Sequence, residues 1–239
     1  DGQHYTHPEE DVVAAIKDSC NYFFYTIGND LGVDTLGQFA HDFGLGVSTG
    51  IELVETKGNM ANRENHWDYT GSEWRIGDTL QSAIGQSDSV FSPLQLAEYC
   101  ATVANQGTRY SASILKAIRS YDYSEKIYER EPEVLSKVES AEYNWAAVHE
   151  GMYEVLHNWE NNGPNVEAWL SCKWTVAGKT GTAEHISTKS DHGAFVCFAP
   201  ANDPQIAISV YVEKGGHGST IASIAKAMMD VYFEVGEIG

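Results

Sequence analysis

The chain has 239 residues, of which 42% are hydrophobic and 21% are charged, and these values exclude a mostly disordered protein. Fifteen basic residues against 34 acidic ones give a formal net charge of −19, which argues against nucleic acid or anionic lipid as a partner. No apolar run approaches the roughly 18 residues of a membrane-spanning helix, so we expect no membrane anchor within these residues.

Apolar residues at helical spacing predict six helical segments, with two short helical pieces around Ala61 and Leu80 in an otherwise loop-rich stretch. Two segments carry a start signal: Thr6-His7-Pro8-Glu9 resembles a capping box, and Ser92-Pro93-Leu94-Gln95 combines an N-cap serine, a first-turn proline and a glutamine. The expected helical segments are 6–16, 22–27, 34–43, 92–105, 141–159 and 219–233.

β-Rich runs separated by turns predict antiparallel strands in the last third of the chain. They are Trp174–Ala177, Gly193–Ala199 and Gln205–Val212, and residues 110–138 indicate a strand, a turn and a polar excursion. The order predicts a mainly helical lobe over residues 1–160, followed over residues 161–239 by strands and a C-terminal helix. The widely spaced Cys20, Cys100, Cys172 and Cys197 are expected to be buried free thiols, without zinc-site spacing.

The most informative string is Gly178-Lys179-Thr180-Gly181-Thr182. A phosphate-binding P-loop requires glycine at the position of Lys173, so that pattern is not met. The string fits the K-T-G strand of penicillin-recognising serine enzymes, in which lysine and threonine face a substrate carboxylate. The β-rich run before Lys179 favours this interpretation. A glycine-rich hairpin turn with a solvated lysine stays open as the alternative.

Ser19-Cys20-Asn21 separates two helical segments. Alone this string is weak evidence, because serine and asparagine at a helix break are usually caps. Beside a K-T-G strand, however, a hydroxyl can relay a proton and an amide can orient a substrate amide. The two strings are 179 − 19 = 160 residues apart, so only the fold can bring them together.

Further strings complete a pattern that covers essentially the whole chain: Leu45–Leu53, Ser82–Gln86, Ser92–Ala97, Phe198–Pro200 and Glu213–Gly218. With them the chain resembles the C-terminal part of the transpeptidase domain of class B penicillin-binding proteins, most closely the elongation type. The resemblance implies the α/β penicillin-binding and serine β-lactamase-like fold, incomplete at the N-terminus, with an antiparallel sheet flanked by helices.

The resemblance also implies roles for individual residues. Ser19 would relay a proton near the leaving amine, and Asn21 would orient the acyl amide. Lys179 would lie at the anionic end of the substrate, where Thr180 and Thr182 would hydrogen-bond its carboxylate. The backbone N–H of Thr182 would form part of the oxyanion hole, and Gly181 would allow the close approach of the substrate. No metal or other cofactor is implied.

The family's nucleophile lies in an S-x-x-K string before S-x-N, and the 18 residues before Ser19 contain no serine. The strings Ser113–Lys116 and Ser223–Lys226 have this spacing but lie in the wrong places. We therefore expect a fragment without its nucleophile, membrane anchor and N-terminal region, which does not acylate alone and is soluble. A sheet edge left open in such a fragment would be covered by a second copy or by swapped elements.

The expected parent protein is a peptidoglycan D,D-transpeptidase at the extracytoplasmic face of the cell membrane. Its partners would be D-Ala-D-Ala stem peptides, β-lactams and the cell-wall synthesis machinery. The residues leave two alternatives open: a non-catalytic scaffold of the same fold, or a β-lactamase or β-lactam sensor. His185, His192 and His217 are expected to be rim histidines rather than metal ligands, and Trp145, Trp159, Trp169 and Trp174 to be packing residues.

Overall fold

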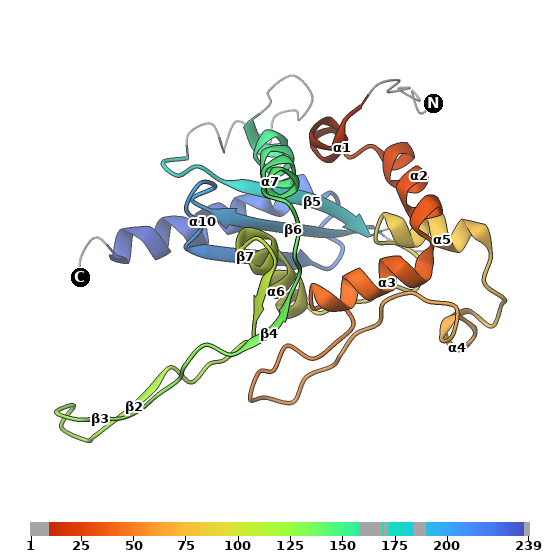
Figure 1. Cartoon of the computed structure of the whole chain (residues 1–239). Helices are drawn as coiled ribbons and strands as arrows, with labels where there is room; N and C mark the ends of the chain where they lie inside the picture. The colour runs from red at the N-terminus through yellow and green to blue at the C-terminus, as the bar shows by residue number, and fades with distance from the viewer. Residues whose placement is uncertain (1–9, 158–168, 170–171, 184–189, 237–239) are drawn as a thin grey trace.

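The computed structural model describes residues 10–157, 169, 172–183 and 190–236. Figure 1 shows a small sheet between helices, a group of N-terminal helices beside it, and a long arm that projects from the body. The helices are α1 (Val12–Asp18), α2 (Asn21–Leu31), α3 (Val33–Asp42), α4 (His66–Thr70), α5 (Ile76–Ala83), α6 (Pro93–Ala104), α7 (Glu142–His157) and α10 (Gly218–Gly236). The strands are β1 (Thr108–Tyr110), β2 (Ala117–Arg119), β3 (Lys126–Glu129), β4 (Val134–Lys137), β5 (Ala177–Ala183), β6 (His192–Ala199) and β7 (Ile206–Val212).

The three-stranded antiparallel sheet has β6 in the middle, between β5 and β7. Successive residues of a strand face opposite sides. Cys197 accordingly belongs to a buried cluster with Met229 of α10, whereas Phe198 belongs to a second cluster with Cys100 of α6 and Met152 of α7. Thus α10 covers one face of the sheet and α6 and α7 cover the other, and the predicted mixed α/β architecture is confirmed (Figure 1).

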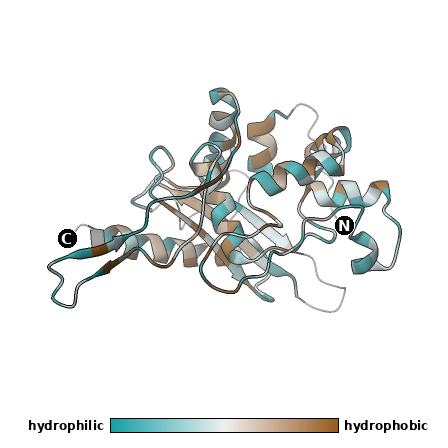
Figure 2. Ribbon diagram, turned by 60° about the horizontal axis from the view of Figure 1, so that its bottom comes forward, coloured by the Kyte–Doolittle hydropathy of each residue, from teal (hydrophilic) through white to brown (hydrophobic). Residues whose placement is uncertain are grey.

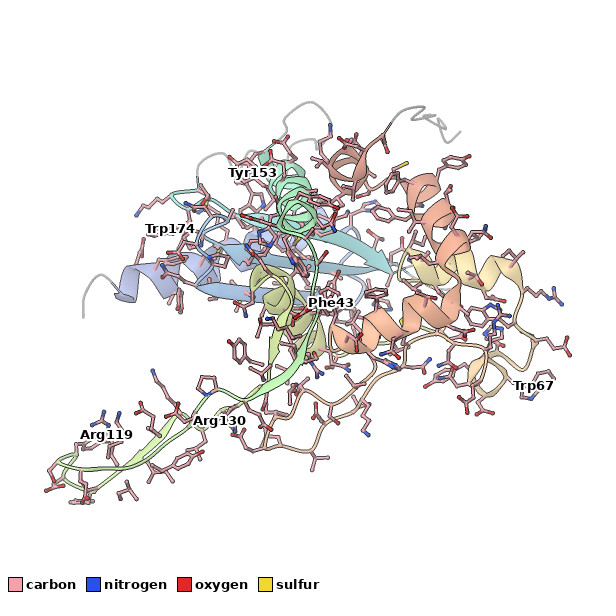
Figure 3. The ribbon with its side chains drawn as sticks, in the orientation of Figure 1. Phe43, Trp67, Arg119, Arg130, Tyr153 and Trp174 are labelled. Atoms are coloured by element: carbon pink, nitrogen blue, oxygen red, sulfur yellow. The ribbon has the colours of Figure 1, made fainter. Side chains whose placement is uncertain are left out.

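The strand that carries the K-T-G string begins later than the sequence indicates. Residues 174–176 were expected to be strand, but β5 begins at Ala177. The carbonyl of Thr175 accepts the backbone N–H of Ala201 at 2.9 Å. The ring of Trp174 packs on Phe233 of α10 with centroids 4.3 Å apart (Figure 3). The prediction for residues 174–176 is wrong because these tertiary contacts outweigh the β propensity of the run.

Local chemistry sets several helix ends. Asp11 Oδ1 accepts the N–H of Ala14 at 2.9 Å at the start of α1, and the predicted capping box of Ser92 and Gln95 is present at the start of α6. The helical piece expected around Ala61 is wrong. Asn62 Oδ1 instead accepts the N–H groups of Glu64 and Asn65 at 2.9 Å each, and this turn comes before α4. The capping box predicted at residues 6–9 lies outside the described residues.

Two small two-stranded sheets, β1 with β4 and β2 with β3, build the arm. Glu52 ties the root of the arm to the loop after α3: its carboxylate contacts Ser113, accepts the N–H of Ile114 at 3.1 Å and pairs with Arg130 at 3.1 Å. Arg119 and Arg130 lie along the arm (Figure 3). Figure 2 shows that most of the arm is hydrophilic, with short hydrophobic stretches in its strands.

The division into a lobe of residues 1–160 and a part of residues 161–239 stays a prediction, since that boundary falls among residues outside the description. All four cysteines are free, and Cys20, Cys100 and Cys197 are buried as expected. The expectation is wrong for Cys172, which is only partly buried. Trp145 and Trp169 are buried packing residues. Trp159 lies outside the described part of the chain.

Candidate functional site

Ser19 lies at the C-terminal end of α1, where the helix closes with a left-handed residue. Its φ and ψ are 53° and 47°, and the following N–H of Cys20 returns to the carbonyl of Ala15 at 3.0 Å. Cys20 is buried, whereas the side chains of Ser19 and Asn21 are exposed at the junction with α2. A non-glycine residue in this conformation is strained by about 1 kcal/mol, so the surrounding packing must hold Ser19 in place.

Lys179 lies in the middle of β5, on the sheet face that α6 and α7 cover. Because α1 packs on α7 and α7 packs on β5, the end of α1 comes to rest beside this face. Lys179 Nζ hydrogen-bonds Ser19 Oγ, so the fold joins two residues that are 160 positions apart. Burial lowers the pKa of Lys179 to about 8, because a buried ammonium loses hydration. Near neutral pH this lysine can therefore both donate and accept a proton.

Thr180, Gly181 and Thr182 follow on the same strand, opposite Phe195, Ala194 and Gly193 of β6. β5 is an outer strand of its sheet within the described residues, so one of its edges faces away from β6. At Gly181 a side-chain Cβ would meet Ala194 Cβ at 3.4 Å, an ordinary contact. Glycine is needed more strictly at Gly218, the first residue of α10. A Cβ there would lie 2.2 Å from the Ala194 carbonyl oxygen and 2.5 Å from that of Gly181, too close for any side chain.

Asn21 occupies the first turn of α2, two residues after Ser19. Its side chain makes no hydrogen bond to the part of the chain that the structure describes. The structure thus joins Ser19 with Lys179, places Thr180 to Thr182 next along the strand, and leaves the Asn21 amide accessible at the α1–α2 junction.

A cavity of about 720 Å³ opens beside the end of β5, and its walls are mostly apolar. Gly181 and Thr182 line one side of it. Phe43 at the end of α3 (Figure 3) also lines the cavity, and its ring centroid lies 5.8 Å from that of Tyr99 and 6.2 Å from that of Trp145. The volume is in the range of small-molecule sites in proteins, and the threonine-bearing strand end supplies polar groups at its rim.

Sequence reasoning missed one residue of this region. Gln86, in the loop after α5, lines the cavity and donates from Nε2 to the carbonyl of Thr182 at 3.0 Å. The string Ser82–Gln86 contributed to the resemblance, but nothing local in it points to a partner 96 residues away.

The two S-x-x-K strings lie elsewhere. Ser113 contacts Glu52 at the root of the arm, and Ser223 is exposed on α10, where Lys226 pairs with Asp230 at 2.9 Å. Neither serine contacts Lys179 within the described residues. Among the predicted rim histidines, His217 is exposed and the ring of His192 stacks on Tyr211, whereas His185 lies outside the described residues. The structure groups no three metal-ligating side chains in its described ranges.

The comparison with protein families gives a match to the penicillin-binding protein transpeptidase domain over residues 1–230. The chain therefore belongs to the family of penicillin-binding protein transpeptidase domains. Within it, the chain is of the class B type that includes the MrdA proteins. Peptidoglycan D,D-transpeptidase MrdA of Acinetobacter baumannii is 32% identical over 233 residues, and that of Haemophilus influenzae is 31% identical over 245 residues.

These alignments cover 91% and 95% of the chain but only 34% and 37% of the two relatives, so the chain spans little more than a third of their length. Among solved structures, penicillin-binding protein PBP2 of Pseudomonas aeruginosa in complex with WCK 5153 has a TM-score of 0.78 at 32% identity, covering 95% of this chain and 53% of that one. A complex of PBP2 and MreC from Helicobacter pylori has a TM-score of 0.80 at 26% identity, covering 95% and 41%.

Proposed function

We propose that this chain forms the S-x-N and K-T-G parts of the active site of a serine-type peptidoglycan D,D-transpeptidase. The observation that carries the proposal is the contact of Ser19 with Lys179, on the strand whose residues Gly181 and Thr182 line an apolar cavity. In the reaction, a serine attacks the carbonyl of a D-Ala-D-Ala stem peptide and D-Ala leaves as an amine. The acyl group then passes to an amine on a neighbouring stem, and β-lactams trap the acyl stage.

The lysine and the serine form a proton relay in this proposal. When the C–N bond of the tetrahedral intermediate breaks, the Ser19 hydroxyl gives its proton to the departing amine and takes one from the Lys179 ammonium. Because its pKa is about 8, Lys179 is mostly protonated at neutral pH and so carries the proton that it gives to Ser19. The Asn21 amide orients the acyl amide, and the Thr180 and Thr182 hydroxyls bind the terminal carboxylate. The Thr182 N–H donates to the oxyanion, and Gly181 leaves room for the substrate backbone.

The attacking serine is proposed to be neither Ser113 nor Ser223. The first is engaged by Glu52, and the second lies on the exposed side of α10. A nucleophile needs a neighbouring base, and neither serine has Lys179 as its neighbour in the described ranges. We therefore propose that the 239-residue chain by itself is catalytically incomplete.

We further propose that the working protein acts with the cell-wall synthesis machinery at the extracytoplasmic face of the cell membrane. Two solved relatives support this assignment: a PBP2–MreC complex, and a peptidoglycan synthase complex with a TM-score of 0.73 at 27% identity. No helix in the described residues is long and apolar enough to cross a bilayer.

Intact-mass measurement after incubation with benzylpenicillin tests the proposal. Two samples are compared: the 239-residue chain and the protein produced from its complete reading frame. The expected result is an unchanged mass for the chain and one penicilloyl group on the complete protein, lost in Lys179→Ala and kept in Lys173→Ala, a surface control.

Each contrary outcome has a definite meaning. A complete protein that forms no adduct contradicts the enzyme and supports a non-catalytic scaffold of the same fold. An adduct on the chain alone places the nucleophile within it, and peptide mapping then decides among Ser19, Ser113 and Ser223. Rapid release of the penicilloyl group would indicate a β-lactamase.

A further inference from the structure

The side chain of Gln86 reaches from the loop after α5 to the K-T-G strand. Its side-chain Nε2 donates to the carbonyl oxygen of Thr182 at 3.0 Å, across 96 residues of sequence. Both residues are half-buried and both line the cavity. The contact lies on the edge of β5 away from β6, where a strand carbonyl has no strand partner in the described residues.

The direction of this carbonyl also fixes the direction of the N–H of the same residue. In an antiparallel ladder, the N–H and C=O of one residue point to the same side, and successive residues alternate. Because the Thr182 carbonyl points away from β6 toward Gln86, the Thr182 N–H points out of the same edge. Two residues earlier, the Thr180 carbonyl accepts Lys179 Nζ at 3.3 Å, which agrees with this alternation.

The backbone around Gln86 is held on its N-terminal side by the end of α5. The N–H of Gly85 returns to Ser82 at 3.1 Å and that of Gln86 returns to Gln81 at 3.0 Å. Gly85 has a φ of 79°, as this type of helix end requires. Ser87 is also left-handed, with a φ of 64°. Gln86 thus lies between two left-handed residues that turn the chain sharply and direct its side chain to β5.

A buried polar network holds the other side of the loop. The Asp88 carboxylate lies 2.5 Å from Nδ1 of His66, which is only 2% exposed. Asn59 Nδ2 donates to the Asp88 carbonyl at 2.8 Å, and the backbones of Asn59 and Val90 exchange hydrogen bonds of 2.7 and 2.8 Å. These hydrogen bonds keep the loop after Gln86 rigid, because breaking one of them would leave a buried polar atom without a partner.

We propose that Gln86 is a positioning residue, which holds the outer edge of β5 so that the Thr182 N–H is aimed at the oxyanion. This inference rests on the proposed function, because it concerns the oxyanion donor of that reaction. A hydrogen-bond donor stabilises a developing oxyanion only if its direction is set before the reaction. The Gln86 amide supplies that direction without touching the substrate.

The test measures acylation of the complete protein by nitrocefin, with variants of Gln86. Gln86→Met keeps the size of the side chain and removes the donor. We expect it to slow acylation by about 10- to 100-fold, with the melting temperature little changed. Gln81→Met, on the exposed side of α5, is the matched control and should acylate at the wild-type rate.

Gln86→Glu supplies a signature that a merely structural role would not give. An ionised carboxylate repels the Thr182 carbonyl, whereas a protonated carboxyl group can donate an O–H to it. The acylation rate of Gln86→Glu, divided by that of the wild type at the same pH, should therefore recover as the pH falls through the pKa of the new carboxyl group.

Failure of the inference and failure of the proposed function are distinguishable. A wild-type protein that is not acylated contradicts the proposed function. A wild-type protein that is acylated, with Gln86→Met within twofold of its rate, contradicts the positioning role alone. The positioning role is also overturned by a second pair of results. In that case Gln86→Met loses rate together with a large drop in melting temperature, and Gln86→Glu does not recover at low pH.

Discussion

Arg109 on β1 and Glu98 on α6 form a buried ion pair, with Arg109 Nη2 3.1 Å from Glu98 Oε2 and both side chains no more than 6% exposed. Arg109 also donates from Nη2 to the carbonyl of Ser48, so the pair pins the loop after α3 to the helical body. Burial raises the pKa of Glu98 to about 7, although Arg109 acts in the opposite direction.

This pair should make stability depend on pH. Between the ordinary pKa of 4.5 and the folded value of about 7, the folded protein binds more protons at Glu98 than the unfolded chain does. The contribution of Glu98 to the free energy of unfolding therefore falls as the pH rises through this interval. Urea unfolding from pH 4.5 to 8 should show that fall in the wild type and a flatter profile in Glu98→Gln. Parallel profiles would contradict the prediction.

Removing the cation should be more damaging than removing the acid. Arg109→Met leaves an uncompensated buried carboxylate and should lower the free energy of unfolding by about 3–5 kcal/mol at pH 8. The loss should shrink at pH 5, where Glu98 is protonated. The exposed pair of Lys126 and Glu129 on the arm is the control, and Lys126→Met should change stability by less than about 1 kcal/mol. An equal loss of stability in Arg109→Met and Lys126→Met would contradict the claim that Arg109 compensates a buried carboxylate.

Lys179 should lower the stability of the folded protein near neutral pH, because burial disfavours its charged form. Its pKa is about 8 in the folded protein and 10.5 in the unfolded chain, so the unfolded chain binds more protons between these values. The lysine's contribution to the free energy of unfolding therefore rises with pH from 8 to 10.5. Lys179→Met should lack this rise and be more stable than the wild type at pH 7 by on the order of 1 kcal/mol. Chemical unfolding at pH 7, 8.5 and 10 measures both effects, with the exposed Lys173→Met as control.

Two helical glycines should respond oppositely to alanine. A Cβ at Gly28 of α2 would lie 2.2 Å from Ala83 Cβ of α5, whereas a Cβ at Gly37 of α3 would meet nothing within 4 Å. Gly28→Ala should lower the free energy of unfolding by about 1–3 kcal/mol through overpacking. Gly37→Ala should raise it by about 0.5–1 kcal/mol through helix propensity. Thermal unfolding of the two variants tests this prediction. A change of melting temperature with the same sign in both would contradict the packing argument.

Gln95 should matter far more than an exposed glutamine. It is fully buried, and Nε2 donates to the carbonyls of Val47 and Lys57 at 2.8 Å each. Gln95→Ala leaves both carbonyls without this donor and removes the return bond of the capping box, so we expect a loss of about 2–4 kcal/mol in denaturant unfolding. Gln38→Ala, which removes an exposed bond to Asp42, should change stability by no more than about 0.5 kcal/mol. A similarly small change in both variants would show that the loop between Val47 and Lys57 does not depend on Gln95.

Local sequence determined the parts of this protein that local physics controls. The capping box of Ser92 and Gln95 needs only neighbouring residues, and the strands at residues 192–199 and 206–212 follow from β-rich runs between turns. The K-T-G and S-x-N strings can likewise be recognised in the sequence alone, because each is defined by particular residue types at a fixed spacing. The helix expected near Ala61 and the strand expected at residues 174–176 were misplaced, because side-chain and long-range hydrogen bonds outweigh weak propensity there.

Tertiary structure alone decided how the candidate site is assembled. Ser19 meets Lys179 because α1 packs on α7 and α7 packs on β5, a sequence of contacts that no window of residues contains. The lowered pKa of Lys179 needs that burial, and the bond from Gln86 to Thr182 needs both the end of α5 and the outer edge of β5. Periodicity and caps act over a few residues, whereas burial and edge geometry arise only when distant elements exclude water from one another.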